Sequence, residues 1–217
     1  MPTLDEEAAV RRLLPEALAV ADQVIVSDGG STDSTVAVAE ELGVPVVQGE
    51  RGRGPQLNLG ASEASSDTVV FLHADTQLPA DGIDLIRRAV ETGHVGGGFL
   101  IRFDDPRPIF GLGSHIVNLR TTLTRSPLGD QAQFATKKVF SDLGGYRSWP
   151  ILEDLDFASR LKRMGPIAII KSPAKTSARR FVRGGVAATI ANNWLIFGLY
   201  FLGVSPERLA RLYRPTR

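Results

Sequence analysis

Apolar positions in the first half of the chain alternate between two spacings. Residues 6–21 place apolar and charged side chains at helical spacing, and residues 23–27 form a short β-branched run that ends at Asp28. This order repeats, which favours a parallel, doubly wound α/β arrangement in which helices join successive strands. The predicted helices are 6–21, 31–42, 57–65 and 80–92, and the predicted strands are 23–27, 44–48 and 68–72.

Capping residues and breakers set the ends of two of these helices. Ser31 or Thr32 is available as the N-cap of the second helix, and Gly43 is its stop signal. Pro79 opens the fourth helix and Gly93 ends it. These signals separate each helix from the strand that follows.

The second half of the chain loses this regular alternation. Its predicted strands are 96–103, 134–136 and 167–170, and its predicted helices are 109–124 and 151–164. We expect a single domain over residues 1–217, with a regular half at 1–95, a mixed half at 96–170 and a basic helical segment at 171–217.

Composition is that of an ordinary globular protein. The 217 residues are 43% hydrophobic and 23% charged, which is enough for a sizeable core. The absence of cysteine excludes disulfides and thiolate metal sites and fits a reducing compartment. The apolar stretch 194–204 is shorter than the ~20 residues of a spanning helix. Since the start resembles no signal peptide, we expect a cytoplasmic protein.

Charge is unevenly distributed along the chain. The formal net charge is +1, yet the residues from Lys171 onward include nine basic side chains and one acid, Glu207. Such an end attracts a phosphate ligand or an anionic membrane surface, and a solvated basic tail is the alternative. The basic residues are Lys171, Lys175, Arg179, Arg180, Arg183, Arg208, Arg211, Arg214 and Arg217.

Four acidic or glycine-rich segments carry the candidate chemistry, and the middle two directly follow predicted strands. Strand ends in an open α/β sheet are the usual place for ligand-binding side chains. Each segment also has a structural interpretation, because Ser, Thr and Asp cap turns and acids favour helix N-termini. The segments are Pro2-Thr3-Leu4-Asp5-Glu6-Glu7, Asp28-Gly29-Gly30-Ser31-Thr32-Asp33, His73-Ala74-Asp75 and Glu153-Asp154-Leu155-Asp156.

Taken together, the four segments resemble the family-2 glycosyltransferases of the GT-A fold, in a compact bacterial subgroup with His-Ala-Asp where the family has Asp-x-Asp. The resemblance implies an α/β, doubly wound nucleotide-diphospho-sugar transferase fold with a mixed, mainly parallel central sheet. It makes residues 1–95 the nucleotide-binding half and residues 96–170 the acceptor-binding half. It implies inverting, metal-dependent transfer of a sugar from a UDP- or GDP-type donor, with Mn²⁺ or Mg²⁺ as cofactor. By the same resemblance, Asp154 is the catalytic base and Asp75 the metal ligand.

The resemblance also carries over the other binding roles. His73 replaces the usual first acid, so whether it contacts ribose or metal stays open. Arg179 and Arg180 are assigned to the diphosphate, with a surface basic pair as the alternative. The nucleotide-binding set is Thr3, Leu4, Glu6, Asp28, Arg53, Asn58, His73 and Ala74, and the acceptor or sugar set is Asp130, Gln131 and Glu153. Arg53 and Asn58 are also candidates for fixing a loop.

If Thr3 ends a first strand, as the resemblance implies, the apolar residues of that strand are missing before Met1. Neighbouring strands would then keep unpaired backbone groups, which is costly. We therefore expect the natural protein to begin several residues earlier, or this version to be impaired.

Two other functions compete with glycosyl transfer. A sugar nucleotidyltransferase would need a Lys-bearing, glycine-rich loop where this chain has Thr3-Leu4-Asp5-Glu6. A nucleotide-sugar-binding module without turnover fits His73 and the short first strand. The acceptor is not readable from the sequence; a lipid-linked acceptor, peripheral membrane contact through 194–217 and a homo-oligomer are left open, and we expect no nucleic-acid partner.

Overall fold

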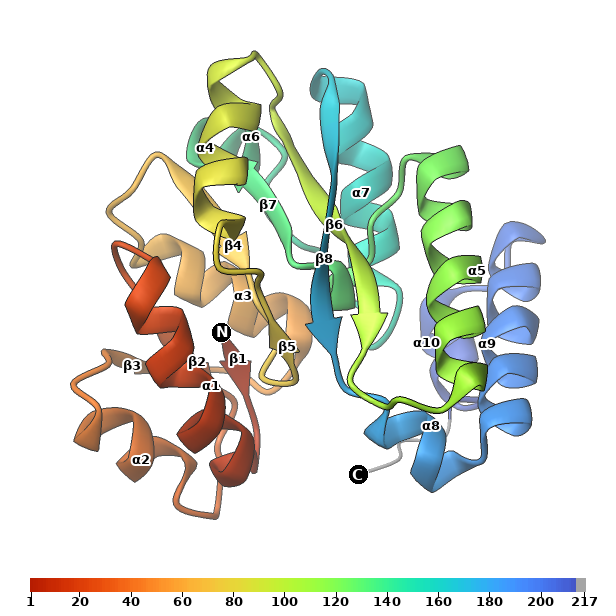
Figure 1. Cartoon of the computed structure of the whole chain (residues 1–217), viewed down its shortest axis with the longest axis horizontal. Coiled ribbons are helices and arrows are strands. Elements are labelled where there is room, and N and C mark those ends of the chain that lie inside the picture. Colours follow the sequence, from red (N-terminus) through yellow and green to blue (C-terminus); the bar gives the residue numbers. More distant parts are fainter. Residues whose placement is uncertain (214–217) are drawn as a thin grey trace.

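Two β-sheets lie at the centre of the molecule, with helices packed around them (Figure 1). The computed structural model describes residues 1–213; Arg214 and Arg217 of the predicted basic segment lie outside the described residues. The strands are β1 (Pro2–Thr3), β2 (Val26–Asp28), β3 (Val46–Gln48), β4 (Thr68–Phe71), β5 (Thr76–Gln77), β6 (Gly96–Phe103), β7 (Gln133–Thr136) and β8 (Ile167–Thr176). The helices are α1 (Glu7–Val20), α2 (Thr35–Glu41), α3 (Arg53–Ser62), α4 (Gly82–Glu91), α5 (Pro108–Thr124), η1 (Gly129–Gln131), α6 (Lys137–Asp142), α7 (Glu153–Met164), α8 (Arg179–Gly184), α9 (Val186–Phe201) and α10 (Pro206–Ala210).

The first sheet has the order β1-β2-β3, and both of its pairings are parallel. Thr3 lies opposite Asp28, because the two strands end at the same edge. The alternation of strands and helices predicted for residues 6–48 is therefore confirmed.

The second sheet is mixed and has the order β4-β7-β6-β8-β5. Here β4 pairs antiparallel with β7, so the third predicted strand joins this sheet instead of the first. Its inward residues, Val69 and Phe71, pack against Phe140, Tyr146 and Phe157 from later in the chain. The local pattern of apolar residues identifies β4 as a strand, whereas packing against residues far along the chain determines which strand it pairs with.

The start of α3 and the end of β8 differ from the sequence prediction. α3 begins at Arg53, before the predicted 57, because Pro55 falls in the first turn, where a helix needs no amide donor. β8 runs on to Thr176, and a register shift opposite Phe99 and Ile101 accommodates Pro173.

The predicted cap of the second helix is wrong. Ser34 occupies the N-cap position of α2 without a side-chain cap bond. Ser31 instead bonds to Asp28, and Thr32 bonds to Asp5. Gly43, with a φ of +72°, does follow the end of the helix as predicted.

An aromatic cluster forms the centre of the largest core. The rings of Tyr146 and Phe157 stack with centroids 4.3 Å apart, and the Phe71 ring meets Tyr146 edge-on at 4.9 Å. Phe157 is fully buried and also contacts Phe140. The cluster fixes α7 against β4, and α7 begins at Glu153 and Asp154.

Truncation of the central ring tests this packing. We expect Phe157→Ala to lower the free energy of unfolding by about 3–5 kcal/mol, because it leaves a cavity that the rigid neighbouring rings cannot fill. Chemical denaturation measures the change. Leu18→Ala, at an exposed position of α1, is the control and should change stability by less than about 0.5 kcal/mol. Similar losses in both variants would contradict the assigned core.

Candidate active site

The parallel pairing of β1 and β2 places Thr3 beside Asp28 at the strand ends. Thr3 Oγ1 donates to Asp28 Oδ1 at 3.0 Å, and the amides of Gly30 and Ser31 donate to Asp28 Oδ2 at 2.8 Å each. Gly30 has a φ of +91°, which glycine adopts without strain. The fully buried carboxylate of Asp28 thus holds the turn, and its nucleoside contact stays a prediction.

The loop after β1 is tied to the same turn. Asp5 Oδ1 accepts from the Thr32 amide at 2.7 Å, and the Glu6 amide donates to Thr35 Oγ1 at 2.8 Å. Arg179 reaches this loop from the far end of the chain and pairs with the Glu6 carboxylate at 3.2 Å. The predicted nucleotide and diphosphate residues therefore meet here.

The His73-Ala74-Asp75 segment connects β4 to β5. Its last residue lies beside the end of β8, because the Ser177 amide donates to the Asp75 carbonyl at 3.0 Å. Asp75 Oδ1 accepts one bond of 3.3 Å from Thr76, and Ala74 is buried. This pairing places Asp75 at the point where the chain turns toward Arg179.

Gly129 brings the two predicted catalytic segments together. Its amide donates to Asp154 Oδ2 at 2.8 Å. A Cβ at this position would lie 2.4 Å from His73 Cε1 and 3.3 Å from Asp154 Oδ2. Only glycine leaves room for both side chains, so His73 and Asp154 approach the same point from different elements.

Negative charge gathers around the neighbouring Asp130. Burial raises the pKa of Asp130 to about 6; the Arg120 guanidinium opposes this shift, and the carboxylates of Asp154 and Asp75 add to it. Burial is the main cause of the shift, and Asp154 and Asp75 both act electrostatically on the same carboxyl group.

His73 is neutral in this setting. Burial lowers the pKa of its imidazole to about 3, and the positive charge of Arg53 adds to the effect. A neutral imidazole offers one donor and one acceptor, so it can serve a hydroxyl or a metal ion.

The buried Glu153, next to Asp154 in sequence, pairs with the half-exposed Arg53. Its Oε1 accepts from Arg53 Nη1 at 3.0 Å, and its side chain is only 1% exposed. Its Oε2 has no hydrogen-bond partner among residues 1–213. Burial raises the pKa of Glu153, Arg53 opposes this shift and Asp154 adds to it. The open carboxyl oxygen is a group that a ligand hydroxyl would satisfy.

The N-terminus of α7 fixes the Asp154 carboxylate. The Leu155 amide donates to Asp154 Oδ1 at 2.7 Å, so both carboxyl oxygens accept from backbone amides. Leu152, just before the helix, has a left-handed φ of +64°. Left-handed backbone at a branched residue stores strain and is common beside functional groups.

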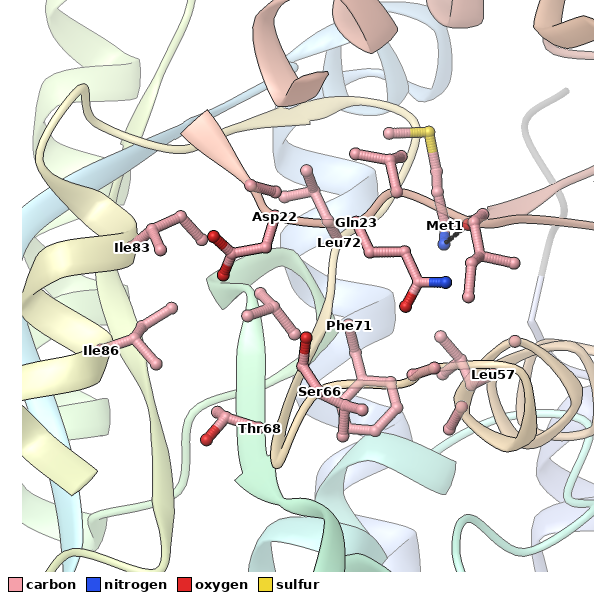
Figure 2. Close-up of a pocket in the computed structure, with 18 of the residues that line it drawn as sticks. Met1, Asp22, Gln23, Leu57, Ser66, Thr68, Phe71, Leu72, Ile83 and Ile86 are labelled. Atoms are coloured by element: carbon pink, nitrogen blue, oxygen red, sulfur yellow. Dashed lines mark hydrogen bonds between the residues drawn. The ribbon is translucent and has the colours of Figure 1, made fainter. Parts of the chain in front are cut away.

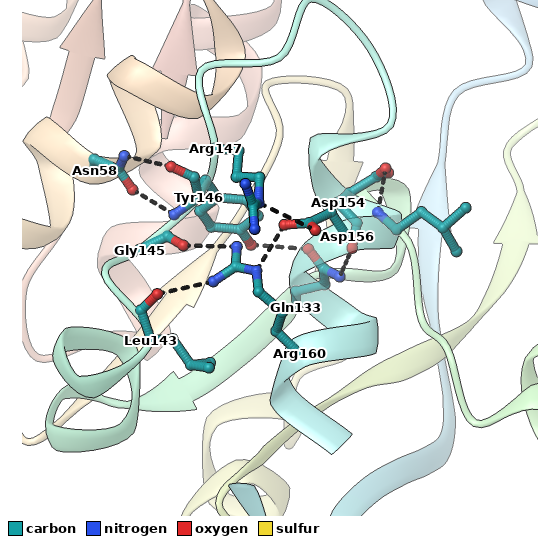
Figure 3. A network of polar contacts seen from close by, with 10 residues as sticks. Asn58, Gln133, Leu143, Gly145, Tyr146, Arg147, Asp154, Asp156 and Arg160 are labelled. Carbon is teal, nitrogen blue, oxygen red and sulfur yellow. Dashed lines mark hydrogen bonds and ion pairs between the residues drawn. The ribbon is translucent and has the colours of Figure 1, made fainter. Parts of the chain in front are cut away.

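A polar network not recognised in the sequence supports this helix end (Figure 3). Gln133 Nε2 donates to the Asp154 carbonyl at 3.0 Å, and Tyr146 Oη donates to Gln133 Oε1 at 2.8 Å. Asn58 exchanges two hydrogen bonds with the Tyr146 backbone, which supports its predicted loop-fixing role. Arg160 binds Asp156 and the carbonyls of 143 and 145.

Two residues that were predicted to contact a ligand interact mainly with other groups of the protein. Gln131, fully buried, accepts from Arg120, Thr121 and the Leu128 amide and donates to the Phe99 carbonyl. Arg180 donates to Asn193 and stacks over the Tyr213 ring at 4.4 Å. The ligand roles of Gln131 and Arg180 stay predictions.

The residues around Asp75 fit a divalent cation that takes most of its ligands from a substrate. No group of three or more His, Asp or Glu side chains in the described part of the chain is placed to hold a metal ion by itself. Asp75 nevertheless keeps coordinating capacity, and Asp130 and Asp154 add negative charge nearby. Mg²⁺ and Mn²⁺ often take one or two protein carboxylates together with phosphate oxygens and water.

A cavity of about 300 Å³ lies apart from this cluster, between the segment leading into β2 and strand β4. Its wall includes Met1, Gln23, Phe71, Leu72 and Ile86 (Figure 2). None of the predicted site residues lines it. This cavity is therefore separate from the candidate site around Gly129.

Comparison with known proteins identifies the family. The sequence profile described as "Glycosyl transferase family 2" matches residues 1–145. The chain belongs to this family. An uncharacterized glycosyltransferase of Rickettsia felis is 36% identical to this family member over 77 residues, which are 35% of this chain and 27% of that protein.

Solved structures share the GT-A fold of this family member. A mannosyltransferase from Pyrobaculum calidifontis, in complex with GDP-Man and Mn²⁺, matches with a TM-score of 0.66 and 20% identity over 97% of this chain and 66% of its own. S. aureus TarS 1-349, in complex with UDP, matches with a TM-score of 0.61 and 20% identity over 82% of this chain. This chain spans 59% of that TarS structure.

A third match is glucosyl-3-phosphoglycerate synthase from Mycobacterium tuberculosis, in complex with Mn²⁺ and UDP, with a TM-score of 0.58 and 20% identity over 88% of this chain and 77% of its own. At these identities the likeness shows the fold. The predicted fold class is therefore confirmed, with parallel pairing in the first sheet and mixed pairing in the second.

The charge at Asp130 gives a pH-dependent prediction. A raised folded-state pKa favours the protonated form, so this contribution to stability is present below about pH 4 and is lost as pH rises through about 6. We expect the stability advantage of Asp130→Asn over the wild type to grow by about 1–3 kcal/mol between about pH 4 and about pH 7.5.

Thermal and denaturant unfolding in the presence of a chelator measure this difference. Asp81→Asn, which removes an exposed carboxylate before α4, is the control. An advantage of Asp130→Asn that does not change with pH would contradict the raised pKa of Asp130.

Proposed function

We propose that the protein transfers a sugar from a nucleotide-diphosphate donor to an acceptor hydroxyl, with inversion and with a divalent cation. The observation that carries the proposal is the loop around Gly129 and Asp130. Gly129 lies against His73 and Asp154, and the carboxylates of Asp75 and Asp154 both add to the raised pKa of Asp130. These contacts support the inference that Asp75, as the metal ligand, and Asp154, as the base, border one site.

On the donor side, the strand ends supply the binding groups. The turn at Asp28 and the loop at Glu6 would contact the nucleoside, and Arg179 would leave Glu6 to bind the diphosphate. Asp75 would hold Mn²⁺ or Mg²⁺, which when bound offsets the negative charge of the departing diphosphate. An arginine matches phosphate oxygens in a bidentate geometry.

On the acceptor side, Asp154 is the base. Its carboxylate is held by the amides of Gly129 and Leu155, so it is oriented before the acceptor binds. Asp154 takes the proton of the acceptor hydroxyl as the acceptor oxygen forms a bond to the anomeric carbon. The bond from that carbon to the diphosphate oxygen breaks on the opposite face, which inverts the configuration. A carboxylate positioned in this way contributes about 10²–10⁴-fold.

The proposal specifies the acceptor only as a molecule that offers a hydroxyl group. Glu153 Oε2, buried and unpaired among residues 1–213, and Asp130 lie beside Asp154 and would bind acceptor or sugar hydroxyls. UDP- and GDP-sugars are the donors to test, because relatives of the same fold have been solved with UDP or GDP-Man.

Two substitutions separate binding from chemistry. We expect Asp154→Asn to lower transfer at least about 10²-fold while keeping Mn²⁺-dependent nucleotide binding, because it removes only the base. We expect Asp75→Asn to lose both transfer and Mn²⁺-dependent nucleotide binding, because it removes the cation ligand. Release of UDP or GDP from a panel of nucleotide sugars measures turnover, and calorimetry with and without Mn²⁺ measures binding.

Asp142→Asn, on an exposed part of α6, is the control and should keep both properties. Undiminished transfer by either test variant would contradict its assignment. Binding by the wild type without transfer or slow hydrolysis would instead indicate a binding module.

A further inference from the structure

The outer surface of α5 is apolar, although the opposite side of the helix is already buried. Phe110, Ser114 and Thr121 face the protein core. On the helical wheel, the exposed apolar positions fall on the side opposite these residues. They follow one another three or four residues apart and are Ile109, Leu112, Ile116, Leu119 and Leu123.

The neighbouring helix α9 has the same character. It contains no charged residue, and its inner side buries Thr189 and Ile196. The two helices are neighbours, since Phe110 of α5 and Val186 of α9 belong to one core cluster, and they lie at the side of the molecule away from the first sheet (Figure 1). The exposed large apolar residues at α9 and its C-terminus are Ile190, Trp194, Leu195, Phe201 and Leu202.

We call these ten residues the apolar face. They are two thirds of the exposed large hydrophobic side chains in the part of the chain that the structure describes, and Leu123 and Phe201 are about three-quarters exposed, at 74% and 75%. Single exposed apolar residues are ordinary, but a continuous set on adjacent helices marks a contact surface.

Charge around the apolar face is mainly positive. Residues 106–129 and 157–206, which contain both helices, include no Asp or Glu. Exposed arginines stand before and after α9, at Arg183, Arg208 and Arg211, and Glu207 is the one exposed acid among them. A second copy docked by the same face would bring an excess of cations together, which is unfavourable.

We propose that the apolar face binds the surface of a membrane that contains anionic lipid. The helices would lie in the interface, with their apolar side chains among the acyl chains and the arginines at the headgroups. No helix of the described residues is long and apolar enough to span a bilayer, which fits a helix that lies on the surface. The cation-rich segments complement the negative charge of such a surface.

The inner sides of the same helices lead to the candidate active site. Ile196 and Leu209 pack against Ile151, which shortly precedes Glu153 and Asp154. Arg120 of α5 donates to Gln131 at 2.9 Å, next to Asp130. Bound in this way, the protein would present its acceptor side near the lipid, a consequence that rests on the proposed function, whereas the membrane contact itself does not.

The test measures binding of the purified full chain to sedimented vesicles. One set contains phosphatidylcholine alone and the other phosphatidylcholine mixed with phosphatidylglycerol. We expect binding to the mixed vesicles that weakens with added salt. Leu119→Gln/Leu123→Gln and Trp194→Gln/Phe201→Gln should each lower the partition coefficient about tenfold or more. Arg208→Gln/Arg211→Gln should lower it about fivefold for each arginine replaced.

Leu18→Gln/Leu42→Gln, which changes two exposed leucines outside the apolar face, is the matched control and should bind like the wild type. Circular dichroism and melting curves verify that each variant is folded. Wild-type protein that stays in the supernatant with both vesicle types would overturn the proposal. So would light scattering that shows a dimer abolished by Leu119→Gln/Leu123→Gln, because the face would then bind a second copy.

Discussion

The candidate site depends on the buried hydrogen bonds of Gln131 and Gln133. Gln131 ties the loop before β7 to α5 and to the Phe99 carbonyl, and Gln133 ties it to the Asp154 carbonyl. Both side chains are almost fully buried, where a lost hydrogen bond leaves an unsatisfied polar group and costs about 1–3 kcal/mol. The loop therefore has one stable position, and in that position Gly129 meets Asp154.

Backbone strain is concentrated around the same elements. Leu152 and Ala132 adopt left-handed φ values of +64° and +45°, and they flank Glu153 and Gln131 respectively. Asp5, in the loop after β1, has a φ of +52°. Such conformations cost about 1–3 kcal/mol each and persist where the surrounding contacts enforce them. The packing of the surrounding cores therefore supplies the free energy that holds Asp154 and the loop after β1 in these conformations.

Sequence reasoning recovered the helices and strands of the first 48 residues, because their periodicity is local. It placed the candidate acids at strand ends, where the structure also has Asp28 and Asp75. It missed that β4 pairs with β7, since that choice depends on packing with Phe157, far along the chain. It also missed Gln133, Tyr146 and Arg160, whose importance comes from partners that no local pattern reveals.

The ion pair between Arg179 and Glu6 joins the start of α8 to the residue before α1, 173 residues away in sequence. Both side chains keep substantial contact with water, and such pairs contribute only about 0–1 kcal/mol. An incoming polyanion can therefore displace Glu6 at little energetic cost. Under the proposed function the contact would act as a latch, because a bound diphosphate would take Arg179 and release the segment that carries Glu6.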